Sequence, residues 1–127
     1  MGAASRRKGA DGERELARVL RERMGDRVVR NLQQSADGGH DLLGAGPFAL
    51  EVKRCERLEL SAWWRQAEEQ AVAGGLIPAL AWRQSRQPWR FMVPMRAIRD
   101  GEECAEGGPA AVLDVDGFVE LVEGLSE

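Results

Sequence analysis

The hydrophobic residues near the start of the chain recur with the period of an α-helix. Residues 13–24 carry apolar side chains three or four positions apart, at Leu16, Val19, Leu20 and Met24. This spacing predicts an amphipathic helix whose N-cap is Asp11. Glu13 falls on the apolar face of this helix, where it either complements the helix dipole or serves a function.

Short apolar runs separated by turn residues predict five strands. They cover residues 27–31, 41–43, 48–55, 77–83 and 89–94, and the second and third form a hairpin. A second helix follows this hairpin, capped by Ser61 and ended by Gly74 and Gly75, and a last helix begins at Asp116. This order of helix, three strands, helix, two strands and helix predicts an α/β fold with a mixed central β-sheet flanked by helices.

Length and composition indicate a single globular domain over residues 1–127. The chain is 43% hydrophobic and 31% charged, and it is long enough to bury a core without disulfides or metals. The longest apolar stretch, residues 74–82, is too short to span a bilayer, and no apolar segment follows the basic residues at the start. We therefore expect a cytoplasmic protein without membrane contact, in which Cys55 and Cys104 are reduced thiols.

Basic and acidic residues are unevenly distributed along the chain. Residues 101–127 hold eight acidic residues and no Lys or Arg, whereas residues 1–100 hold 18 basic residues against 13 acidic ones. We expect a mobile basic arm at residues 1–8, a basic body and an acidic C-terminal segment. The basic part, which includes Arg6, Arg7 and Lys8, is either a surface for phosphate backbones or a solvated arm and helix face.

The strand predicted at residues 48–55 carries the clearest candidate chemistry. Side chains alternate along a strand, so Glu51 and Lys53 point to the same face, roughly 6 to 7 Å apart. Asp41 begins the partner strand of the hairpin, and its carboxylate can approach the same point. Two carboxylates beside an ammonium suit Mg²⁺ or Mn²⁺ and the hydrolysis of a phosphodiester. The alternative is a surface ion pair at a strand end, and His40 is either a loop residue or a catalytic one.

Several segments of the chain resemble the archaeal-type Holliday-junction resolvases, including phage forms, within the PD-(D/E)xK nuclease superfamily. The resemblance covers residues 6–95 and rests on "RKGADGEREL", "VVR", "HDLL", "ALEVKR" and "IPALAWRQSRQPWRFMVP". It implies a restriction-endonuclease-like core in which the metal-site acids are Glu13, Asp41 and Glu51. It also implies that Lys53 is the catalytic lysine, and that the phosphate contacts are Arg14 and Arg30.

This resemblance implies a homodimer that uses a divalent metal, and no small-molecule cofactor, to resolve branched DNA in recombination and repair. Two alternatives stay open: a related nuclease that cuts nicks, flaps or mismatches, and a DNA-binding protein without catalysis. Trp63 and Trp64 project about 100° apart around a helix axis, so one is expected in the core. The other either lies at the edge of the core, stacks on DNA or contacts a second subunit. Residues 89–93 are a second candidate for the contact between subunits.

Overall fold

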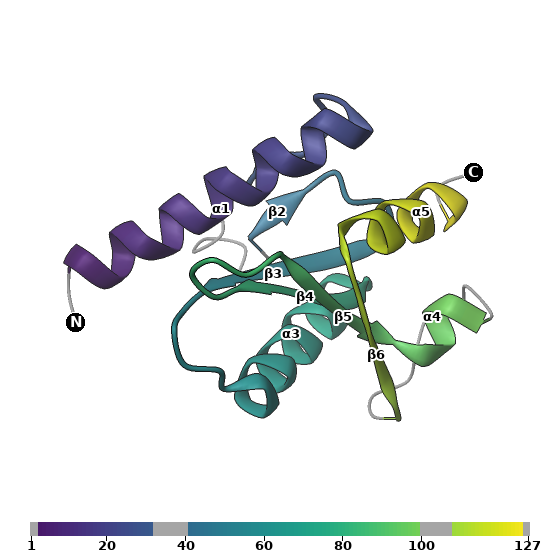
Figure 1. Ribbon diagram of the computed structural model, residues 1–127. Helices are drawn as coiled ribbons and strands as arrows, with labels where there is room; N and C mark the ends of the chain where they lie inside the picture. Colours follow the sequence, from purple (N-terminus) through teal and green to yellow (C-terminus); the bar gives the residue numbers. More distant parts are fainter. Residues whose placement is uncertain (1–2, 32–40, 100–107, 126–127) are drawn as a thin grey trace.

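The computed structural model describes residues 3–31, 41–99 and 108–125, and their side chains from Ala10 onward (Figure 1). The elements are α1 (Ala3–Met24), β1 (Val29–Arg30), β2 (Leu42–Leu43), β3 (Phe48–Arg54), α3 (Leu60–Gly74), β4 (Ile77–Arg83), β5 (Arg90–Pro94), α4 (Met95–Arg99), β6 (Ala110–Leu113) and α5 (Val115–Leu125).

The strands form one six-stranded sheet in the order β1-β2-β3-β4-β5-β6. β3 and β4 are parallel, and the other neighbouring strands are antiparallel. A parallel pair needs a crossover connection, and α3 provides it between β3 and β4. The predicted mixed sheet and the hairpin of β2 and β3 are therefore confirmed.

The two faces of the sheet carry different helices, with α1 and α5 on one side and α3 on the other (Figure 1). Leu50 and Val52 of β3 belong to the larger core, which α1 and α5 cover. Leu80 and Trp82 of β4 belong to a smaller core beneath α3. Because side chains alternate along β3, Glu51 and Lys53 lie on the α3 face.

Aromatic rings join α5 to the larger core. The ring of Phe118 in α5 stacks on Phe91 of β5 at a centroid distance of 4.4 Å and contacts Phe48 of β3 at 5.4 Å. All three side chains are almost completely buried. Aromatic pairs of this kind stabilise a fold beyond the area that they bury. The last part of the acidic C-terminal segment thus contributes to the core.

Both predicted N-caps are wrong. α1 begins at Ala3 and continues through Asp11, because residues before Asp11 such as Arg6, Arg7 and Lys8 also favour a helix. From Ala3 onward, the backbone of the expected arm therefore forms the first turns of α1. α3 begins at Leu60, one residue before Ser61, whereas its predicted end is confirmed by Gly75 in the left-handed conformation.

Two elements were not predicted from the sequence, namely the short helix α4 and the edge strand β6. β6 lies in the acidic segment and pairs with β5 from Ala110 to Leu113. Among the described residues Cys55 takes part in no disulfide bond, and Cys104 lies outside the described residues. Within residues 3–31, 41–99 and 108–125, no helix combines the length and the apolar character needed to cross a membrane.

Candidate active site

Asp41 marks the point at which the sheet opens beside β3. Its backbone N–H donates to the carbonyl of Leu50 at 2.9 Å, and β2 continues the pairing from there toward the hairpin turn. Two residues further along β3, the backbone N–H of Val52 donates a hydrogen bond of 2.7 Å to the Asp41 carboxylate. The carboxylate therefore occupies the place of a neighbouring strand and is held at the edge of β3, next to Glu51.

Glu51 is buried at a position where its ionised carboxylate loses the stabilising contact with water. Its side chain is 2% exposed, and its Oε1 has no hydrogen-bond partner among the described residues. Burial, followed by the negative charges of Asp41 and Glu13, raises the pKa of Glu51 to about 8, while Lys53 opposes the rise. These interactions show that the three carboxyl groups and the ammonium lie within electrostatic reach of each other.

Glu13 reaches this point from α1. Burial and the charge of Asp41 raise the pKa of Glu13, and Arg30 of β1 opposes them through a hydrogen bond from its Nε to Glu13 Oε1 at 3.2 Å. The helix is thus joined to the edge of the sheet that carries Asp41. Glu13 faces the other carboxylates and does not serve as a first-turn charge, since α1 begins ten residues earlier, at Ala3.

The structure brings together the four predicted catalytic residues, Glu13, Asp41, Glu51 and Lys53, and it places Arg30 beside them. Arg14 is exposed and forms an ion pair with Asp11 at 3.2 Å. The side chains of the other predicted DNA contacts, Arg6, Arg7 and Lys8, lie outside the described residues, and so does His40.

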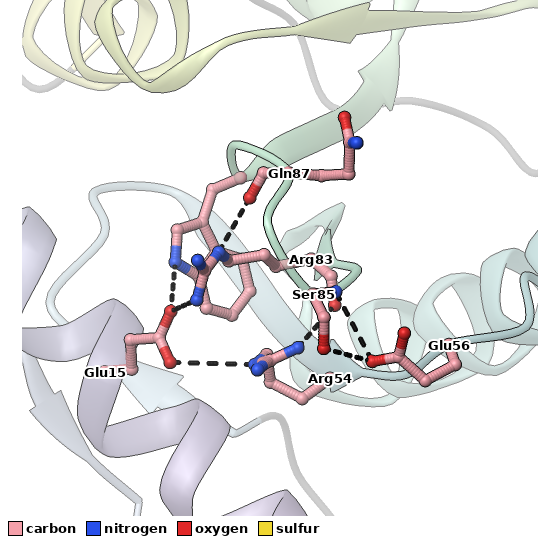
Figure 2. Close-up of polar contacts among 7 residues, drawn as sticks. Glu15, Arg54, Glu56, Arg83, Ser85 and Gln87 are labelled. Atoms are coloured by element: carbon pink, nitrogen blue, oxygen red, sulfur yellow. Dashed lines mark hydrogen bonds and ion pairs between the residues drawn. The ribbon is translucent and has the colours of Figure 1, made fainter.

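A second polar cluster, centred on Glu15, was missed by the sequence analysis. Glu15 Oε1 accepts hydrogen bonds from Arg83 at 2.5 Å and from the indole N–H of Trp89 at 3.2 Å, and its Oε2 pairs with Arg54 at 3.6 Å (Figure 2). Arg54 also packs tightly on Gly12, where an added Cβ would lie 2.6 Å from its Cγ. The cluster holds α1 against the ends of β3 and β4, two residues from Glu13.

The donor chemistry of the four residues suits a hard divalent cation. No group of three or more His, Cys, Asp and Glu side chains in the described parts of the chain is arranged as a metal-binding site. However, the buried Oε1 of Glu51 has no hydrogen-bond partner within the described parts of the chain, and three carboxyl groups repel one another beside one ammonium. Carboxylate oxygens are the ligands that Mg²⁺ and Mn²⁺ prefer, so Glu13, Asp41 and Glu51 fit such an ion chemically.

A mixed sheet flanked by helices, with carboxylates and a lysine at an opened strand edge, is the restriction-endonuclease-like fold. Residues 4–103 match the family described as "Phage putative PDDEXK endonuclease", which spans most of the chain. The chain therefore belongs to this family of PD-(D/E)xK nucleases.

A solved structure shares this fold. It is that of Archaeoglobus fulgidus Hjc, a Holliday junction resolvase from an archaeal hyperthermophile, with a TM-score of 0.51 and 22% sequence identity over 87% of each chain. At this identity the likeness concerns the fold. No curated protein matches the chain.

Proposed function

We propose that the protein is a divalent-metal-dependent endonuclease that resolves four-way (Holliday) junctions in DNA. The observation that carries this proposal is the meeting of three carboxyl groups beside Lys53: Glu13 from α1, Asp41 directly before β2, and Glu51 from β3. Membership of a nuclease family supports hydrolysis of DNA, and the fold that the chain shares with Hjc supports a junction as the substrate. The site of action would be the cytoplasm of a bacterium or of a phage-infected cell.

Each residue of the site has a defined part in this proposal. Asp41, Glu51 and Glu13 would hold Mg²⁺ or Mn²⁺, which supplies charge for the phosphate oxygens and acidifies a bound water. Lys53, on the same face of β3 as Glu51, would orient or deprotonate the attacking water. Arg30 fixes the carboxylate of Glu13 and presents the rest of its guanidinium to a neighbouring phosphate.

Resolution of a four-way junction requires cuts on two opposing strands, and one chain carries one set of Asp41, Glu51 and Lys53. A two-fold symmetric dimer supplies two sites in matching orientation, so we propose a homodimer. In the candidate interface strand at residues 89–93, the side chains of Trp89, Phe91 and Val93 are buried inside the subunit. Trp63 and Trp64 are both partly buried and both pack against the core beneath α3.

A cleavage assay tests the proposed substrate. Four-way, flap, nicked and linear DNA are compared with and without Mg²⁺, and light scattering gives the mass of the protein at the same concentration. We expect Mg²⁺-dependent cleavage, fastest on the four-way junction, by a protein of twice the mass of the chain. A monomer that cuts branched and linear DNA equally would contradict the junction proposal and leave a general nuclease. Binding without cleavage in any metal would contradict catalysis.

The first turns of α1 are expected to strengthen binding to every DNA shape. Replacing Arg6, Arg7 and Lys8 together by Ala should weaken binding to junction and linear DNA alike. It should also reduce the slope of log K against log salt by up to about 0.9 for each phosphate that the variant no longer binds. Fluorescence anisotropy over a series of salt concentrations measures this slope. A slope equal to that of the unchanged protein would show that these residues contact no phosphate.

A further inference from the structure

Three arginines lie where β4 turns into β5: Arg83 at the end of β4, Arg86 in the turn and Arg90 at the start of β5. We call residues 83–90 the hairpin end. Arg83 is engaged by Glu15 and by the carbonyl of Gln87. Arg86 and Arg90 are exposed, and neither guanidinium has a hydrogen bond or ion pair with another described residue. The hairpin end thus combines one structural arginine with two that are available to a ligand.

Arg90 lies in register with the catalytic lysine. Lys53 of β3 pairs with Trp82 of β4, and Trp82 pairs in turn with Arg90 of β5. Directly paired residues on neighbouring strands point to the same face of a sheet. Arg90 is therefore on the α3 face with Glu51 and Lys53, two strand spacings, or roughly 10 Å, from Lys53.

Arg86 is held in a backbone conformation that side chains rarely adopt, with φ of 64°. The turn is fixed on one side by Glu56, which follows β3. The Glu56 carboxylate accepts hydrogen bonds from the hydroxyl and the backbone N–H of Ser85 (Figure 2). Its backbone carbonyl accepts one of 2.9 Å from the side-chain amide of Gln84. These contacts stabilise the conformation that projects Arg86 from the turn.

Arg83 fixes the other side of the hairpin end. Its Nε donates to the carbonyl of Gln87 at 2.7 Å, while its Nη1 donates to Glu15 of α1, and its own carbonyl accepts from Arg54 at 3.2 Å (Figure 2). Glu15 and Arg54 are close in sequence to Glu13 and Lys53. The hairpin end is therefore positioned by the same helix and strand that position the candidate site.

We propose that the hairpin end is a DNA-contacting surface in which Arg86 and Arg90 bind backbone phosphates beside the cleaved bond. This proposal rests on the proposed nuclease function. A phosphate recurs about every 3.4 Å of axis along each DNA strand, so DNA with one phosphate at Lys53 presents others at the distance of Arg90. Guanidinium groups suit phosphate oxygens because they donate two parallel hydrogen bonds. Such contacts position DNA without reading its sequence.

Substitutions that remove each charge separately test the proposal. Arg90→Ala removes the guanidinium in register with Lys53, and Arg86→Gly removes the other one while allowing the positive φ without strain. Arg27→Ala is the matched control. Arg27 is also exposed and without a described side-chain partner, and its carbonyl lies beside Gly44 in the β2–β3 turn, at the opposite end of β3 from Lys53.

The measurement is fluorescence anisotropy with a labelled four-way junction in EDTA, over a series of salt concentrations. Each single variant should lower the slope of log K against log salt by about 0.9, and the double variant by about twice that. The slope for Arg27→Ala should be unchanged, and Arg90→Lys should restore the original slope. In Mg²⁺, the variants should raise KM for DNA and leave kcat at saturating DNA close to that of the unchanged protein.

The outcomes separate this proposal from the proposed nuclease function. If the unchanged protein binds and cuts DNA but the Arg86 and Arg90 variants match Arg27→Ala, the hairpin end does not contact phosphates, and the nuclease proposal stands. If the unchanged protein neither binds nor cuts DNA, both proposals fail. A lowered melting temperature in Arg90→Ala would indicate that Arg90 has a structural role. If Arg90→Lys is equally unstable but recovers the slope, the loss of slope in Arg90→Ala comes from the lost charge and not from the lost stability.

Discussion

Glu51→Gln is expected to reduce the rate of DNA cleavage by more than about a hundredfold while leaving DNA binding nearly unchanged. Replacing a residue that only hydrogen-bonds to a metal ligand already lowers metal affinity or activity roughly 10–100-fold. Glu51 is a proposed ligand itself, so its loss should have a larger effect. The glutamine has the same shape as glutamate but carries no negative charge for a divalent cation. Single-turnover cleavage of a four-way junction in saturating Mg²⁺ measures the rate, and anisotropy in EDTA measures binding.

Asp41→Asn should have the same effect for the same reason. Asparagine retains a side-chain oxygen that can accept the hydrogen bond from the N–H of Val52, so the strand edge should stay in place. Glu69→Gln provides the control, because Glu69 is exposed on α3 and has no part in the site. Cleavage by either site variant at the rate of Glu69→Gln would show that these carboxylates hold no catalytic metal.

The sequence predicted the central part of this site because its geometry is local. Glu51 and Lys53 share a face through the alternation of one strand, and Asp41 is brought to them by one hairpin. The distance in sequence is short, and the turn residues between β2 and β3 are strong signals. Glu13 could be assigned to the apolar face of a helix, but its approach to Asp41 depends on how α1 packs on the sheet. Only the family resemblance indicated its role.

The Glu15 cluster could not be predicted from the pattern of the chain. Its partners are Arg54, Arg83 and Trp89. Arg83 lies 68 positions and Trp89 lies 74 positions after Glu15 in the sequence. An acidic residue on a helix next to other charges is typical of a solvated face. What distinguishes Glu15 is the position of α1 over the ends of β3 and β4, which is a property of the tertiary packing.

Tertiary packing also explains the edge strand that the sequence did not predict, and the burial of residues that the sequence analysis offered for a subunit interface. Residues of β6 such as Ala110 and Ala111 have little intrinsic preference for a strand, and they form one because β5 offers an unpaired edge. The run at β5 was predicted as a strand, but the sequence could not show that α1 and α5 cover its apolar face. Trp89 and Val93 are therefore core residues of the subunit.

The same Glu51→Gln substitution is expected to stabilise the protein in the absence of metal at high pH. The pKa of Glu51 is about 8 in the folded protein, against an ordinary value of 4.5. Between these two values the folded chain retains a proton that the unfolded chain has lost, so the free energy of unfolding falls as the pH rises. The decrease amounts to about 1.4 kcal/mol for each pH unit in this window, and to a few kcal/mol overall.

Thermal unfolding in EDTA at pH 5 and pH 8 measures this effect. The melting temperature of the unchanged protein should fall between the two pH values more than that of Glu51→Gln, because glutamine cannot ionise. At pH 8, added Mg²⁺ should raise the melting temperature of the unchanged protein, since an ion that binds only the folded state stabilises it. The same addition should have little effect on Glu51→Gln. If both proteins lose stability equally with pH, then ionisation of Glu51 does not lower the free energy of unfolding, and no cation is needed to balance the charge of the buried carboxylate.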